Sequence, residues 1–72
     1  MFDQEKFSNR LRKLRRDANI SQSVLADFIG VSTNQISQME KGSKTTSLSR
    51  LCLLCDYFNV SADYLLGRTD EP

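Results

Sequence analysis

Apolar residues recur at intervals of three and four along most of the chain, which is the period of a helix with one buried face. The clearest example lies near the N-terminus, at Phe7, Leu11, Leu14 and Ala18. Asp3 can cap this segment and Asn19 interrupts it, so a helix over about residues 4–17 is predicted. No segment alternates apolar and polar residues as a half-buried strand would, so the pattern favours an all-α domain.

Three further helix starts share one local device. Each has a serine at the N-cap, an apolar residue just before it, and an apolar residue at the fourth helical position, which is the hydrophobic staple. The serines are Ser21, Ser32 and Ser61, and they predict helices from about residues 22, 33 and 62. Gln35 completes a capping box with Ser32.

One more helix is predicted after Ser47, in the segment LSRLCLLCDYF. Its expected core face consists of Leu48, Leu51, Cys52, Cys55 and Phe58. Gly67 is expected to end the last helix in the left-handed conformation. These elements predict a compact five-helix bundle that forms a single domain over residues 1–72.

The segment between Ile20 and Gly42 is the most informative for function. It contains two short helical patterns, over about residues 22–41, joined at Gly30, which permits the positive φ of a tight turn. On the second pattern Ile36 and Met39 share one face. The opposite face carries Thr33, Asn34, Ser37, Gln38 and Lys41. Such side chains hydrogen-bond to base edges, so the arrangement predicts a helix-turn-helix whose second helix reads DNA.

Candidate phosphate contacts flank that helix. Gln22 opens the preceding helix, where free backbone N–H groups attract an anion. The loop that follows the reading helix contributes Lys41, Ser43, Lys44 and Thr45. Residues 1–50 carry nine Lys/Arg against five Asp/Glu, and residues 51–72 carry one against four. This imbalance fits a protein that turns one side toward a polyanion.

The charges of the first helix allow a simpler interpretation. Lys6, Arg10, Arg12, Lys13 and Arg16 are expected mainly to solvate an exposed helix face.

These motifs resemble the lambdoid repressor and Cro-type helix-turn-helix family of bacterial and phage regulators, also called the xenobiotic-response-element family. The matching residues are Ser21-Gln22, Leu25-Ala26, Gly30-Val31-Ser32, Ile36, Glu40, Gly42, Ser47-Leu48, Val60-Ser61 and Tyr64-Leu65-Leu66-Gly67.

The resemblance implies a lambda-repressor-like bundle and a DNA-binding transcriptional regulator, expected to be a repressor. It places base reading at Thr33, Asn34, Ser37 and Gln38, and phosphate contact at Gln22 and the loop from Lys41 to Thr45. It also implies a structural ion pair between Arg15 and Glu40, partly buried, that fixes how the reading helix docks.

A second surface is expected on the fourth helix. Leu53 and Tyr57 lie four residues apart and away from the expected core face, which suggests a contact surface. We expect a homodimer with Leu53, Tyr57 and Tyr64 at its seam, bound to a pseudo-palindromic operator with half-sites about 34 Å apart. The alternative is that the C-terminal tail merely shields the Leu53–Tyr57 pair.

The reading face contains no Arg, the residue that most often contacts guanine. Asn34 and Gln38 favour adenine and Thr33 favours thymine, so an A/T-leaning half-site is predicted.

The cysteines invite a metal or redox interpretation that other residues do not support. A zinc site would need two more ligands, and the chain has no His and no other Cys. A redox pair normally sits at a helix N-terminus, whereas Cys52 and Cys55 lie inside a predicted helix. We therefore expect both to pack in the core, and we expect no metal, cofactor, small-molecule ligand or catalytic residue, so no enzyme.

The chain lacks a long apolar run, and its N-terminus does not resemble a signal peptide, so no membrane contact and a cytoplasmic location, in a bacterial or phage-infected cell, are expected. Two alternatives stay open. One is a DNA-binding antitoxin or restriction-modification controller on the same fold. The other is a protein-interaction module without DNA binding. Gln22 and Lys41, the cation on the reading face, argue against it.

Overall fold

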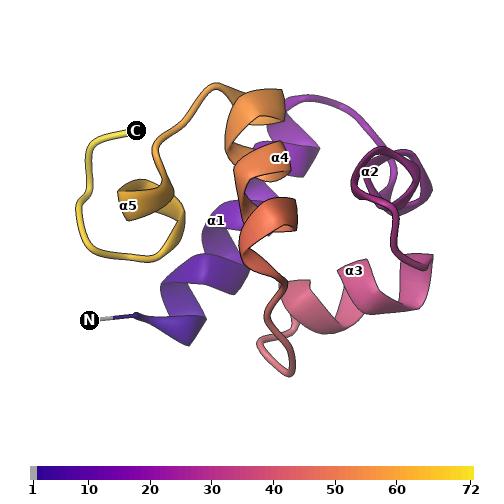
Figure 1. Ribbon diagram of the computed structural model, residues 1–72, viewed down its shortest axis with the longest axis horizontal. Helices are drawn as coiled ribbons and strands as arrows, with labels where there is room; N and C mark the ends of the chain where they lie inside the picture. The colour runs from indigo at the N-terminus through magenta and orange to yellow at the C-terminus, as the bar shows by residue number, and fades with distance from the viewer. Residues whose placement is uncertain (1) are drawn as a thin grey trace.

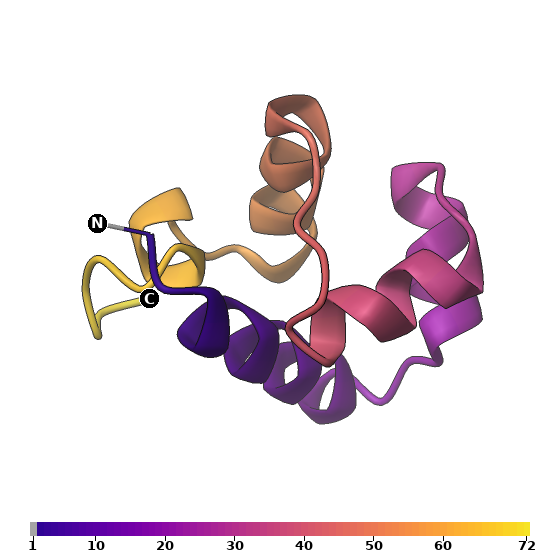
Figure 2. The same cartoon turned by 90° about the horizontal axis from the view of Figure 1, so that it is seen from below.

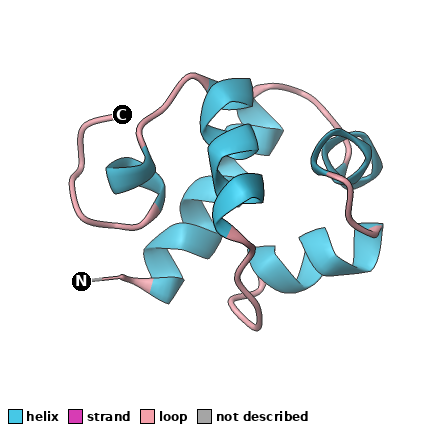
Figure 3. Cartoon of the chain, viewed as in Figure 1, coloured by secondary structure: helices cyan, strands magenta, loops and turns pink. Residues whose placement is uncertain are grey.

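The computed structural model describes residues 2–72, which form five helices (Figure 1). In chain order they are α1 (Gln4–Asp17), α2 (Gln22–Ile29), α3 (Thr33–Glu40), α4 (Leu48–Phe58) and α5 (Ala62–Leu65). The described residues contain no strand (Figure 3). The all-α five-helix bundle predicted from the sequence is therefore confirmed. None of these helices is long and apolar enough to span a membrane.

Local capping chemistry explains where the helices begin. The N-cap side chain of each helix accepts a hydrogen bond from the backbone N–H three residues further on. The five N-caps are Asp3, Ser21, Ser32, Ser47 and Ser61. The capping box between Ser32 and Gln35 is present, as predicted. Asn19, with a φ of 58°, separates α1 from α2, and Gly67, with a φ of 79°, follows the C-cap of α5.

All five helices contribute to one core. The buried apolar side chains are Phe7, Leu11, Leu25, Ala26, Ile29, Ile36, Met39, Leu51, Leu54 and Leu65. The staple residues Ile20, Val31 and Val60 pack against this cluster from the positions just before the N-caps. The staples therefore join the starts of α2, α3 and α5 to the core.

The predicted core face of α4 needs correction. Leu48 is 82% exposed and Cys52 is exposed, whereas Leu51 and the unpredicted Leu54 are buried. The segment is apolar on nearly every side, so its period alone does not select a face, and packing against α2 and α5 decides the matter. A similar error occurs at Ala18, which is the exposed C-cap of α1 rather than a core residue.

The arrangement of the helices separates two ends of the molecule. The pair α2–α3 lies at one end, while α5, the start of α1 and the C-terminus lie at the other (Figures 1 and 2). The longest helix, α1, contacts α3 and α5 and therefore links the two ends.

Candidate nucleic-acid interface

The third helix presents a polar face outward from a buried apolar one. Ile36 and Met39 are fully buried and anchor α3 to the core. Thr33 and Asn34 at its N-terminal end are exposed, and Ser37 and Gln38 are half-buried. The side chains expected to read bases therefore share the outward face of α3, within reach of a large ligand.

An ion pair fixes the C-terminal end of α3 to α1. Arg15 donates from Nε to Glu40 Oε2 at 2.6 Å and from Nη2 to Oε1 at 3.0 Å. The Glu40 side chain is only 4% exposed and that of Arg15 13% exposed. The hydrogen bond to Glu40 raises the pKa of the Arg15 guanidinium. The pair implied by the family resemblance is thus present, and it is the fork-to-fork geometry in which Arg binds a carboxylate best.

The same pair reaches the loop between α1 and α2. Arg15 Nη1 also donates to the carbonyl oxygen of Ile20 at 3.0 Å, and Gln22 Nε2 donates to Glu40 Oε1 at 3.2 Å. Three segments therefore meet at one buried carboxylate. Gln22, expected to face a phosphate, uses one amide N–H inside the protein and keeps the rest of its amide for another partner.

The loop after α3 is held by hydrogen bonds of its backbone at Ser43 and Lys44, while most of its side chains are exposed. Its backbone accepts a hydrogen bond from Gln4 Nε2 at Lys44 O, and Ser43 N–H donates to Gln38 O. Gly42 has a φ of 85°, and an added Cβ would lie 3.4 Å from Ser8 Oγ, so the loop passes close to α1. The side chains expected to contact phosphates, those of Lys41, Ser43, Lys44 and Thr45, are exposed.

Two side chains that sequence reasoning missed also support α3. Arg50 of α4 donates from Nε to Ile29 O at 3.1 Å and from Nη2 to Gly30 O at 3.3 Å, and so holds the turn between α2 and α3. Ser23 of α2 places its Oγ 3.2 Å from Thr33 Oγ1. Neither contact has a sequence signal, because each depends on how two helices cross.

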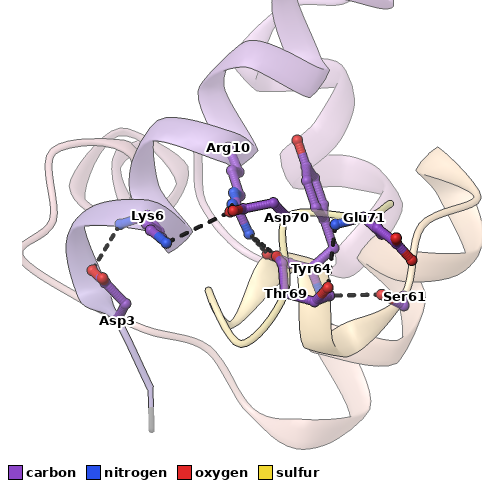
Figure 4. Close-up of polar contacts among 8 residues, drawn as sticks. All are labelled: Asp3, Lys6, Arg10, Ser61, Tyr64, Thr69, Asp70 and Glu71. Carbon is purple, nitrogen blue, oxygen red and sulfur yellow. Dashed lines mark hydrogen bonds and ion pairs between the residues drawn. The ribbon is translucent and has the colours of Figure 1, made fainter.

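The basic residues of α1 do not all lie on an exposed face. The expectation that Arg10 is mainly solvated is therefore wrong. Its side chain is 14% exposed, and its guanidinium donates to Thr69 O and Asp70 Oδ1 at 2.6 Å each and also to Tyr64 O (Figure 4). Lys6 lies 3.6 Å from the same Asp70 carboxylate. The acidic tail therefore neutralises two cations that could otherwise face a polyanion. Lys13 and Arg16 are exposed, as expected, and Arg12 is half-buried.

The expected dimer seam divides between two places. Leu53 and Tyr57 are both partly exposed on α4, as predicted. The ring of Tyr57 packs edge-on against that of Phe28 of α2, with centroids 4.7 Å apart. Tyr64 instead lies under the Arg10 guanidinium, 4.3 Å from its ring centroid. Phe28, which sequence reasoning did not assign to this surface, is thus the aromatic neighbour of Tyr57, and Tyr64 belongs to the contact between α5 and α1.

The two cysteines differ, which corrects the prediction that both pack in the core. Cys55 is half-buried against the core, and burial raises the pKa of its thiol. Cys52 is exposed, because the core face of α4 runs through Leu51 and Leu54 instead. Among residues 2–72 no group of three or more His, Cys, Asp or Glu side chains could hold a metal ion.

A family model described as helix-turn-helix matches residues 11–65. The chain is 36% identical to the uncharacterized HTH-type transcriptional regulator YobD of Bacillus subtilis over 66 residues, which cover 92% of this chain and 59% of YobD. The chain therefore spans little more than half the length of that curated relative.

Two solved structures have the same fold. The P22 c2 repressor, in complex with synthetic operator 9T, matches with a TM-score of 0.79 and 33% identity over 83% of this chain and 91% of that one. The restriction-modification controller C.AhdI of Aeromonas hydrophila matches with a TM-score of 0.76 and 30% identity over 88% of this chain and 96% of that one. From its matched residues and its bundle, the chain belongs to the helix-turn-helix family.

Proposed function

We propose that the chain is a sequence-specific DNA-binding domain of a transcriptional regulator, and specifically a cytoplasmic repressor, with α3 in the major groove. The observation that carries the proposal is the exposed polar face of α3, held from behind by Ile36, Met39 and the buried Arg15–Glu40 pair. The similarity to a repressor solved in complex with a synthetic operator supports this assignment.

In this proposal base reading and phosphate contact come from different segments. Thr33, Asn34, Ser37 and Gln38 contact base edges, because they share the outward face of α3. Gln22, Lys41, Ser43, Lys44 and Thr45 contact phosphates on either side, and these contacts orient the helix without reading sequence.

The primary test is a gel shift with a pool of random duplexes, followed by sequencing of the bound fraction. A selected sequence supports the proposal, and no bound fraction at about 50 mM salt contradicts it and favours a protein-interaction module. Lys44→Ala should weaken binding to all sequences and reduce the salt slope by about one unit. Lys13→Ala removes another exposed lysine, from α1, and is the matched control, expected to leave the slope unchanged.

The selected site tests the identity of the bases. We expect an A/T-leaning half-site, because Asn34 and Gln38 can each pair with adenine through two hydrogen bonds. Asn34→Ala should relax selection at one base pair, at a cost of about 1–3 kcal/mol for the preferred sequence. A contacted core of uninterrupted G·C pairs would overturn this assignment.

We further infer a homodimer on a pseudo-palindromic operator, with a seam at Leu53 and Tyr57; Tyr64, expected there from the sequence, packs instead against Arg10 of α1. The partial exposure of Leu53 and Tyr57 on one helix supports the inference. Leu53→Glu should place a charge in the seam and shift the sedimentation equilibrium toward monomer, whereas Leu48→Glu, at a more exposed site on the same helix, should not. An unchanged dimer in Leu53→Glu would refute this seam.

A second candidate function is that of a restriction-modification controller, because the controller C.AhdI shares this fold with a TM-score of 0.76 and 30% identity. A controller would bind DNA through the same face of α3, so the gel shift does not separate the two. Selected sites that lie beside restriction and modification genes would favour the controller over the repressor.

A further inference from the structure

The first residue of α3 is held by a side chain from another helix. Thr33 follows the N-cap Ser32, and its Oγ1 lies 3.2 Å from the Oγ of Ser23 in the first turn of α2. At this distance either hydroxyl can donate to the other. Both side chains are exposed, so the contact lies on the outer surface of the helix pair.

The orientation of Thr33 is otherwise weakly determined. A threonine in a helix divides between two χ1 rotamers because its hydroxyl can bond to the preceding turn. At the first helical position no helical turn precedes Thr33, so neither that hydrogen bond nor contact with such a turn selects a rotamer. The hydrogen bond to Ser23 therefore favours one χ1 rotamer of Thr33, a preference that the local backbone does not provide.

We propose that Ser23 is a positioning residue for Thr33. It holds the Thr33 hydroxyl toward α2 and leaves the Cγ2 methyl as the part of Thr33 that contacts a base. A methyl group makes apolar contact with the C5-methyl of thymine. This inference rests on the proposed DNA binding and assigns one specificity determinant to a residue that itself reads no base.

The first test needs no DNA. Three-bond NMR couplings to Thr33 Cγ2 report the χ1 distribution in the free protein. We expect the couplings of one staggered rotamer in the native chain and averaged couplings in Ser23→Ala. Ser49→Ala removes a hydroxyl from the same helical position in α4 and should leave Thr33 unchanged. Identical Thr33 couplings in the native chain and in Ser23→Ala would overturn the proposal.

The second test is the same duplex selection on four proteins: the native chain, Ser23→Ala, Thr33→Val and the double variant. Ser23→Ala should lower the preference for thymine at one base pair about fourfold. That factor corresponds to the free energy of burying one methyl group. Other positions and the salt slope should not change. Thr33→Val presents a methyl group in place of the hydroxyl, so adding Ser23→Ala to it should have no further effect.

The outcomes separate this inference from the proposed function. If the native chain selects no sequence, the proposed function fails and this inference fails with it. If the native chain selects a site and Ser23→Ala selects it equally well, only the role of Ser23 is refuted. A loss of affinity that is uniform over all sequences would also refute it, because that is the behaviour of a phosphate contact.

Discussion

Two arginines of α1 each bind a carboxylate, and the two ion pairs lie in opposite surroundings. Arg15 contacts Glu40 of α3, and the two side chains are only 13% and 4% exposed. Arg10 contacts Asp70 in the C-terminal tail, whose side chain is 85% exposed. Both guanidinium groups also donate to backbone carbonyl oxygens, Arg15 to one and Arg10 to two.

The difference in burial between Glu40 and Asp70 shows which interaction stabilises each contact. The buried Glu40 carboxylate depends on Arg15, because a buried charge without a partner is costly. The exposed Asp70 carboxylate can be solvated without Arg10, since water screens it. We infer that a charge pair fixes α3, whereas Arg10 holds α5 and the C-terminal tail mainly through the carbonyl groups of Tyr64 and Thr69.

Loss of Glu40 should have the largest effect. Glu40→Ala leaves the Arg15 guanidinium buried without its carboxylate and should lower the free energy of unfolding by about 3–5 kcal/mol. Urea denaturation measures this. Asp17→Asn, which removes the exposed partner of Lys13, should change stability by less than about 0.5 kcal/mol. A double-mutant cycle of Arg15→Met and Glu40→Ala without coupling would contradict the comparison.

Glycine substitutions compare the two ends of the molecule. Gly67 and Gly30 both have positive φ, so alanine at either should cost about 1–2 kcal/mol. At Gly67 the new Cβ would also lie 2.7 Å from Asp3 Cβ, whereas at Gly30 nothing lies within 4 Å. Gly67→Ala should therefore be the more destabilising of the two in urea. Equal losses of stability in the two variants would mean that Asp3 moves away from the new Cβ at residue 67 without a measurable loss of stability.

Removal of Arg10 should have a moderate effect. Arg10→Met keeps an apolar side chain over the Tyr64 ring but removes the donors to the Tyr64 and Thr69 carbonyl groups, at a cost of about 1–3 kcal/mol. Asp70→Asn keeps those donors in place and should cost clearly less. Similar losses in the two variants would show that the exposed charge pair, and not the carbonyl contacts, holds the tail.

The smallest effect should be a dependence on pH. The hydrogen bond from Arg10 lowers the pKa of Asp70 below its usual 3.8. A carboxyl whose pKa is lower in the folded state stabilises the fold above its usual pKa and loses that contribution as the pH falls through the folded value. The difference in stability between the native chain and Asp70→Asn should therefore be present at about pH 6 and shrink below pH 3.8. A difference that grows with acid would refute the pair.

The same contrast explains what could be predicted from the sequence. Helix starts depend on residues close in sequence, so Ser21, Ser32 and Ser61 located three of them correctly. The Arg15–Glu40 pair joins residues 25 apart, and only the family resemblance indicated it. The Arg10 contacts span 54 to 60 residues and have no local pattern. In α4, leucines at 48, 51, 53 and 54 fit more than one face, so packing had to decide.

The N–H of Asp3 donates to the carbonyl oxygen of Leu66 at 2.9 Å, which ties the two ends of the chain together at the flank opposite α3 (Figures 1 and 2). A mechanical force applied between the two termini would load this hydrogen bond and the Arg10 contacts first. Such a pull should separate the tail from α1 before any load reaches the buried Glu40, so α3 should be insulated from tension at the chain ends.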